Sequence, residues 1–198
     1  MGGLTPIPPD HVATVVTTLE MRSRPEAAPV PPSPLRLVRW DRPSPDRYRG
    51  LFRRVGEPWL WFSRLAMDDA RLLSIVHDPD VSVFAAVDGR GDEVGMVELD
   101  HRPARQCEIG YFALIPEKTG VGHGRWLMAQ ALDRAWGRLI DGVRVNTCTL
   151  DHPRALGFYR AQGFVAVSRT VETFPDPRAI GLLPAHAAPH VPYLASRR

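Results

Sequence analysis

The sequence has few cysteines, almost no lysine and no long apolar run. Cys107 and Cys148 are the only cysteines among 198 residues, so no disulfide framework is expected, and a reducing compartment, the cytoplasm, is predicted. No stretch approaches the roughly 18 consecutive apolar residues of a membrane-spanning helix. The first residues also lack the basic and apolar regions of a signal peptide. We therefore expect a cytoplasmic protein with no membrane partner.

Charge of either sign is dispersed along the chain. Lys118 is the single lysine among 25 basic residues, and the net charge is +3. No block of five or six like charges occurs, and basic residues are not interleaved with aromatic ones, so a nucleic-acid partner is not expected. Apolar residues make up 44% of the chain, which suits a folded domain with a buried core.

Proline concentrates at the two ends of the chain. Of 20 prolines, eight lie in residues 1–34 and five in 175–192. We predict a proline-rich N-terminal extension over 1–34, with a possible extra strand at the β-branched segment 11–21. Residues 35–174 form the predicted domain. The proline-rich tail 175–198 is expected to wrap the surface or cover a sheet edge.

Strand and helix patterns alternate within the predicted domain. Helices are expected at 45–55, with Ser44 as the N-cap, and at 59–66, 67–76, 124–140 and 154–161. Strands are expected at 35–40, 81–87, 93–100, 106–115, 143–150 and 164–171. This order predicts an α/β fold with a mixed sheet.

A glycine-rich segment joins a predicted strand to a predicted helix. Gly120, Gly122 and Gly124 alternate with other residues at this junction. Glycine lets a ligand approach the backbone, and the free amides and dipole of a helix start attract anions such as phosphate. A turn without a ligand is the alternative. Neither the P-loop nor the dinucleotide fingerprint fits, because Arg125 follows Gly124 and only His123 separates the second and third glycines.

Two motifs resemble those of the GCN5-related N-acetyltransferases (GNAT). Residues 119–124 resemble the family's Arg/Gln-x-x-Gly-x-Gly/Ala, with Thr119 in place of Arg or Gln. Residues 152–164 resemble Asn-x-x-Ala-x-x-Phe/Leu-Tyr-x-x-x-Gly-Phe, with His152 in the Asn position. The matching residues of this second motif are Ala155, Phe158, Tyr159, Gly163 and Phe164.

The resemblance covers about residues 35–171 and implies a fold. That fold has a central mixed, mostly antiparallel sheet of six to seven strands, with helices on both faces. A V-shaped splay separates its fourth and fifth strands, here 106–115 and 143–150. The resemblance also implies acetyl-coenzyme A as the co-substrate, bound in this splay, and no metal. The cofactor-binding residues that it implies are Leu114, Ile115, Thr119, Gly120, Val121, Gly122, His123, Gly124, Arg125, His152, Ala155 and Phe158.

The resemblance assigns catalytic roles to two residues. Tyr159 matches the family's general acid, which protonates the departing thiolate, although packing alone would also explain it. Glu108 aligns with the catalytic glutamate of the histone-acetylating branch. Strand alternation would place Glu108 and Phe112 on one face. Glu98 and Asp100 are rival bases, and an arginine pair, an ammonium-binding role for Glu108 and a water base stay open.

The acceptor side is less defined by the sequence. Trp59 and Trp61 fall in the region that forms the acceptor wall in the family, where they would bind an apolar or cationic amine; packing against the sheet is the equal alternative. Glu98 is the carboxylate that we expect to contact the acceptor. Three other acidic residues would favour a cationic acceptor if they line the same cleft: Asp68, Asp69 and Asp100.

The sequence therefore predicts a cytoplasmic acetyl-coenzyme A-dependent N-acetyltransferase that acts directly on a primary amine of a small molecule or peptide. Neither cysteine is expected to act as a nucleophile, and a homodimer is one assembly left open. A longer acyl group or an oxygen nucleophile is one alternative. A coenzyme A-binding sensor without turnover is another. The departures at Thr119 and His152 favour the sensor, whereas the intact Tyr159 counts against it.

Overall fold

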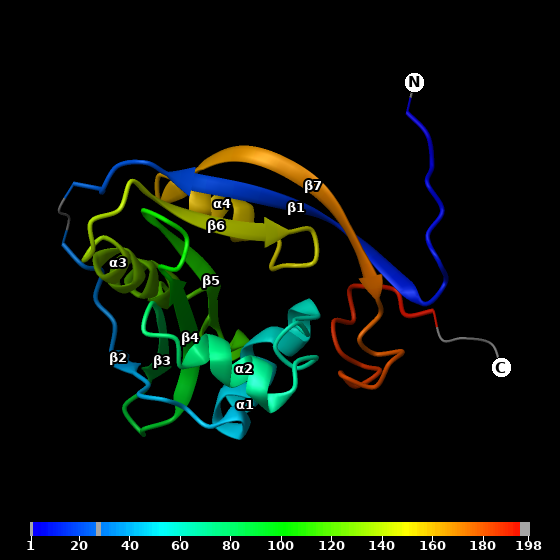
Figure 1. Cartoon of the computed structure of the whole chain (residues 1–198), viewed down its shortest axis with the longest axis horizontal. Coiled ribbons are helices and arrows are strands. Elements are labelled where there is room, and N and C mark those ends of the chain that lie inside the picture. The colour runs from blue at the N-terminus through cyan, green and yellow to red at the C-terminus, as the bar shows by residue number, and fades with distance from the viewer. Residues whose placement is uncertain (1, 27–28, 195–198) are drawn as a thin grey trace.

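A single seven-stranded sheet forms the centre of the computed structural model, which describes residues 2–26 and 29–194 (Figure 1). The strands are β1 (His11–Met21), β2 (Arg36–Arg39), β3 (Val81–Val87), β4 (Glu93–Asp100), β5 (Gln106–Leu114), β6 (Gly142–Cys148) and β7 (Val165–Pro175). The α-helices are α1 (Pro45–Gly56), α2 (Asp69–Val76), α3 (His123–Ala135) and α4 (Ala155–Ala161), with short 3₁₀ helices at Glu57–Trp59 and Pro116–Lys118. The strand order is β2-β3-β4-β5-β6-β1-β7.

The sheet is antiparallel except between β5 and β6, which are parallel. This arrangement confirms the predicted mixed, mostly antiparallel fold. Strand β1 lies inside the sheet, because it pairs with β6 on one side and β7 on the other (Figure 1). The proline-rich N-terminal segment thus supplies an interior strand.

Helices cover both faces of the sheet, as predicted. Side chains alternate along β3, so Val83 and Ala85 join the buried cluster that contains α1 and α2. Phe84 and Ala86 join the cluster on the other face, which contains α3 and Tyr159 of α4. Because both faces are covered, β3 is apolar at every position except Ser82.

Two predicted helices differ from the observed ones. Helix α3 ends at Ala135, five residues before the predicted end, so Leu139 is 84% exposed and is not part of its buried face. Gly137 follows the helix and donates its amide to the Arg134 carbonyl, which closes the last turn. The predicted helix at 59–66 is wrong, because only Glu57–Trp59 is helical and Leu60 has a positive φ of 56°. The Ser44 cap of α1 is confirmed by its bond from the Arg47 amide.

The parallel strands β5 and β6 separate part of the way along their length. They pair from Gln106–Gly142 to Ile109–Val145, although β5 continues to Leu114 and β6 to Cys148. Beyond this point β6 is held by β1 alone, through the pairs that extend to Val16–Cys148. The predicted splay is therefore confirmed.

The proline-rich tail is organised by a buried ion pair and packs on the domain through apolar side chains. The Arg178 side chain is 1% exposed and donates to the Asp176 carboxylate at 2.7 Å. The same guanidinium donates to the carbonyls of Ala187 and Val191. Leu183 and Ala187 join the buried cluster that contains α1. A single arginine thus holds the turns of the tail together.

Asp176→Ala should destabilise the protein by about 3–5 kcal/mol, because it leaves the Arg178 charge buried without its partner. The matched control is Asp141→Ala, which removes an exposed pair with Arg105 and should change the stability far less, because water screens exposed ion pairs. Urea unfolding measures both changes in the free energy of unfolding. Equal costs for the two variants would contradict a stabilising role for the buried pair.

Candidate active site

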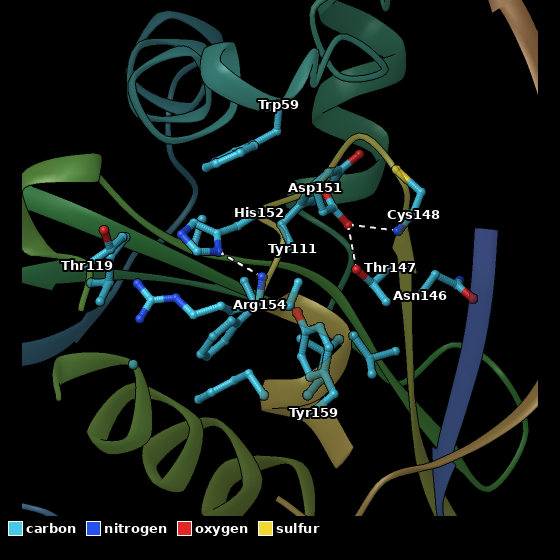
Figure 2. Close-up of a pocket in the computed structure, with 18 of the residues that line it drawn as sticks. Trp59, Tyr111, Thr119, Asn146, Thr147, Cys148, Asp151, His152, Arg154 and Tyr159 are labelled. Atoms are coloured by element: carbon cyan, nitrogen blue, oxygen red, sulfur yellow. Dashed lines mark hydrogen bonds between the residues drawn. The ribbon is translucent and has the colours of Figure 1, made fainter. Parts of the chain in front are cut away.

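The splay between β5 and β6 opens into a cavity of about 1020 Å³ (Figure 2). Its wall is formed by the ends of both strands, the glycine-rich segment, the start of α3, and α4. Trp59 and Trp61 contribute from the segment after α1. Val16 of β1 and Glu172 of β7 complete the wall. The cavity thus gathers residues from most of the length of the chain.

A β-bulge at Gly110 shifts the alternation of side chains along β5. Glu98 of β4 pairs with Tyr111 and Leu99 pairs with Ile109, so Gly110 is the extra residue. Ile109 and Phe112 consequently share one face of the sheet. The prediction that Glu108 and Phe112 lie on the same face is therefore wrong, because the bulge reverses the alternation between them.

Backbone amides of β5 point into the splay. The Ile115 amide donates to the Val94 carbonyl, which makes Gly95 and Leu114 a non-hydrogen-bonded pair of the antiparallel ladder. The N–H groups of Leu114 and Phe112 therefore point away from β4, toward the side from which β6 has departed. A ligand in the splay can accept hydrogen bonds from both.

The glycine-rich segment presents further free amides. Gly120 and Gly122 have positive φ values of 80° and 94°, which glycine adopts without strain. Helix α3 begins at His123 with no side chain capping its first amides, so its N-terminus can bind an anion. Thr119 turns its hydroxyl back to the Pro116 carbonyl at 2.8 Å. The anion-binding groups of this segment are thus mainly backbone amides.

Most of the predicted cofactor-binding residues line the cavity: Leu114, Thr119, Gly120, Gly122, Gly124, Arg125, His152, Ala155 and Phe158. Ile115, Val121 and His123 lie outside its wall. Val121 is 66% exposed. The His123 ring instead forms a hydrogen bond with Ser33 through Nδ1 at 3.1 Å.

Two arginines stand at the glycine-rich end of the cavity. Arg125 lies in the first turn of α3, directly after Gly124. Arg154 precedes α4 and extends toward the glycine-rich segment, with Nη2 3.5 Å from where a Cβ of Gly120 would lie (Figure 2). Sequence reasoning did not include Arg154, although its place directly before Ala155 of the second motif could have indicated it. This end of the cavity is therefore positively charged.

The Tyr159 hydroxyl faces the cavity between the two splayed strands (Figure 2). The residue is 7% exposed, and its ring packs against Phe112, Phe158 and Phe164. Burial raises the pKa of Tyr159 above its ordinary value, and the charge of Asp151 raises it further. The hydroxyl is therefore protonated in the neutral range, and it makes no hydrogen bond to any residue that the structure describes.

Neither carboxylate predicted at the reaction centre lines the cavity. Glu108 lies behind the wall, where its Oε1 accepts a hydrogen bond from Asn146 at 3.2 Å, and Asn146 itself lines the cavity. Glu98 is 1% exposed and accepts hydrogen bonds from the Tyr48 hydroxyl at 2.5 Å and from Arg64 at 2.6 Å. A Cβ at Gly110 would lie 3.2 Å from Glu98 Oε1, so the bulge and this buried network fit together.

The carboxylates in the described part of the wall are Asp151 and Glu172, which sequence reasoning did not identify. Asp151 accepts hydrogen bonds from Trp61 Nε1 at 3.2 Å, from the Thr147 hydroxyl at 2.8 Å and from the Cys148 amide at 2.9 Å. Of the other acidic residues considered for the cleft, Asp69 pairs with Arg49 and Asp100 with Arg102. Asp68 caps α2 through the Arg71 amide.

The two tryptophans of the wall are fixed by their neighbours. Trp61 packs against Phe52 and Tyr111. A Cβ at Gly56 would lie 2.5 Å from the Trp61 Cβ, so only glycine leaves room for this ring. Trp59 contacts the rings of His152 and His190, the latter from the tail. Both indoles therefore form a rigid aromatic side of the cavity.

The two cysteines are poor nucleophiles in this environment. Burial raises the pKa of Cys107 to about 12 and raises the pKa of Cys148 as well. Both thiols are therefore neutral at physiological pH. Within the described residues, no cluster of three or more His, Cys, Asp or Glu is arranged to hold a metal ion. No helix there has the length and apolar character to cross a bilayer.

Comparison with known proteins found a matching family model and similar solved structures. The model of the Acetyltransferase (GNAT) family matches residues 35–164. No curated protein matches the chain. A functionally unknown conserved protein from Staphylococcus epidermidis ATCC 12228 has 14% identity and a TM-score of 0.56, with 84% of this chain and 63% of that chain covered.

Two further solved structures share the fold. A GCN5-related N-acetyltransferase from Sphaerobacter thermophilus has 18% identity and a TM-score of 0.62, with 81% of this chain and 51% of that chain covered. The IAA acetyltransferase from Bacillus cereus ATCC 14579 has 18% identity and a TM-score of 0.51, with 68% and 79% covered. At these identities the likeness shows the fold alone, and the chain spans less than two thirds of the first two structures.

The arginine-lined end should bind inorganic pyrophosphate, and Arg154→Ala should weaken that binding by about 10–100-fold, the effect of losing one charge-assisted hydrogen bond. Titration calorimetry measures the affinity. The control is Arg160→Ala, which removes an exposed arginine of α4 outside the cavity wall. Equal affinities for the two variants would contradict the assignment of this end to an anion.

Proposed function

The chain belongs to the acetyltransferase (GNAT) family, and we propose that it transfers an acetyl group from acetyl-coenzyme A directly to the primary amine of a small-molecule or peptide acceptor. The observation that carries the proposal is the splay itself, where free amides of β5 meet the uncapped start of α3. The proposed setting is the cytoplasm, and the proposed reaction uses no metal.

The residues of the wall suit coenzyme A at its two chemically different parts. The amides at the start of α3, with Arg125 and Arg154 beside them, match the pyrophosphate and phosphate groups. The amides of Phe112 and Leu114 match the amide carbonyls of the pantetheine arm and the thioester oxygen. Acetyl-coenzyme A supplies the activated acyl group in this reaction. The wall between these points is apolar and fits the rest of the arm.

Direct transfer requires a group that polarises the thioester carbonyl, an acid for the thiolate and a base for the amine. The Leu114 amide polarises the thioester carbonyl, as an oxyanion-hole donor does. The acceptor nitrogen attacks the carbonyl carbon, the carbon–sulfur bond breaks, and Tyr159 gives its proton to the sulfur. Glu108 takes the amine proton through solvent in the cavity, because it stands one hydrogen bond behind the wall at Asn146. The products are an N-acetyl amine and the free thiol.

A coenzyme A-binding sensor is the rival function. Thr119, which stands where the family has Arg or Gln, turns its hydroxyl away to Pro116 and so removes one contact to the ligand. Arg154 offers a replacement charge at the neighbouring Gly120. The buried Tyr159 hydroxyl, directed into the cavity without a partner, favours the enzyme. Release of free thiol from acetyl-coenzyme A in the presence of amines separates the two functions.

Gly122→Val should abolish the thermal stabilisation by acetyl-coenzyme A, because a β-branched residue is strained at φ +94° and its side chain would enter the anion site. For the parent, ligand at one hundred times Kd should add about 2.7 kcal/mol to the free energy of unfolding. Gly91→Val is the control, since Gly91 has φ +92° in the open β3–β4 turn. A ligand-induced Tm shift in Gly122→Val equal to that of the control would refute the anion site.

Tyr159→Phe should lower kcat by about 10²–10⁴-fold, the usual contribution of a positioned acid, and leave KM for acetyl-coenzyme A nearly unchanged. The phenylalanine ring keeps the packing against Phe112 and Phe164, so coenzyme A affinity should also persist. Because the pKa of Tyr159 is raised, the parent should retain its acid form and its rate up to a pH above the ordinary tyrosine value.

Thiol release measured against pH gives both readouts for Tyr159→Phe. Tyr193→Phe is the control, because Tyr193 packs over Arg178 in the tail, outside the cavity wall. A kcat of Tyr159→Phe within about threefold of the control would remove Tyr159 from the mechanism. A raised KM with an intact kcat would assign it to binding instead.

A further inference from the structure

We propose that the acceptor carries two positive charges, as an α,ω-diamine does, with the reacting amine beside Asp151 and the second cation at Glu172. This inference rests on the proposed function, because it names the substrate class of the same cavity. The proposed acceptor is a primary amine that a short apolar chain joins to a second ammonium group.

The charges of the cavity wall are divided between two ends. Arg125 and Arg154 stand at the glycine-rich segment, and Figure 2 shows Arg154 directed toward Thr119. Asp151 points the other way, toward Thr147 and Cys148 at the end of β6 (Figure 2). The anionic donor thus fits the first end, and a cation fits the second.

In this proposal the acceptor nitrogen arrives beside Asp151. Asp151 and Tyr159 both line the cavity, so the carboxylate and the proposed acid border the same space. Trp61, Thr147 and the Cys148 amide hold the carboxylate in one orientation. No arginine or lysine forms an ion pair with it among the described residues. An incoming ammonium group would supply that missing charge.

Glu172 provides the second carboxylate from β7. It pairs with Thr14 of β1, so its side chain lies on the same face of the sheet as Thr14 and Val16. That face includes the cavity wall, to which Val16 and Glu172 both contribute. Arg169 is three residues earlier on β7 and lies on the opposite face. Glu172 forms no hydrogen bond or ion pair with any described residue.

The surface beside the two carboxylates suits a short methylene chain. Trp59, Trp61 and Val16 border this end of the cavity. Indole faces attract both apolar chains and ammonium groups. Because Trp61 is hydrogen-bonded to Asp151, the aromatic side and the first carboxylate are fixed together. Glu172 is exposed to solvent, so it would attract a cationic tail and repel an acidic one, whereas a neutral tail would leave its carboxylate hydrated.

Matched acceptors test the second charge: α,ω-diamines of three to six carbons, the corresponding amino alcohols, and the corresponding amino acids with a terminal carboxylate. Thiol release with acetyl-coenzyme A gives kcat/KM for each. The parent should prefer the best diamine to its amino alcohol by about three- to fivefold, the effect of one ion pair at an exposed carboxylate. Amino acids should be the poorest acceptors.

Glu172→Gln should remove the preference for the diamine and leave kcat/KM for the amino alcohol within about threefold of the parent. Glu172→Lys should reverse the order of diamine and amino acid. The control is Asp133→Asn on α3, whose carboxylate pairs with Arg24 away from the cavity. Asp151→Asn should instead lower kcat/KM for all three acceptor classes, because it removes the contact to the reacting amine.

Calorimetry of the diamine with the coenzyme A-loaded protein separates this inference from the proposed function. Diamine binding that Glu172→Gln weakens about three- to fivefold, without turnover, would retain the acceptor class and refute the transferase. Turnover of amines with no preference for the diamine, or a preference that survives in Glu172→Gln, would overturn the acceptor class and retain the transferase. Absence of both diamine binding and turnover would also overturn the proposed acceptor class.

Discussion

The loss of pairing between β5 and β6 after Ile109–Val145 is the constraint on which the rest of the structure depends. A sheet that opens in its interior leaves the amides of Phe112 and Leu114 without strand partners, and such groups are costly unless water or a ligand satisfies them. The open end of β6 remains ordered because β1 pairs along its other edge. The N-terminal strand thus supports the opening in which we propose that the donor binds.

Electrostatics divides the opened space into two parts. Peptide amides and arginines gather where α3 begins, and the carboxylates of Asp151 and Glu172 gather where β6, β1 and β7 meet. Between them stands Tyr159, whose raised pKa keeps its proton in place. An anionic acyl donor and a cationic acceptor would therefore enter from opposite ends and meet at a proton donor.

Local patterns in the sequence predicted the backbone of the glycine-rich end of the cavity. The spacing of Gly120, Gly122 and Gly124 before a helix indicates free amides through backbone chemistry alone, and the structure has this loop and helix start. The placement of Glu108 failed because a bulge at Gly110 adds one residue to β5, which a period of two does not anticipate. The bulge depends on a non-local partner, the buried Glu98, which fills the space that a side chain at Gly110 would need.

At the proposed acceptor end, the sequence pointed to Trp59 and Trp61 but not to the carboxylates of the cavity wall. The family match covers residues 35–164, whereas Val16 and Glu172 lie outside it and meet only because β1 is inserted between β6 and β7. His190 of the tail also reaches this end, where it packs on Trp59. The residues that we propose for the donor lie in the matched region. The proposed acceptor end combines Asp151 and the two tryptophans of that region with Val16 of β1 and Glu172 of β7, and it is there that the specificity of this protein should be sought.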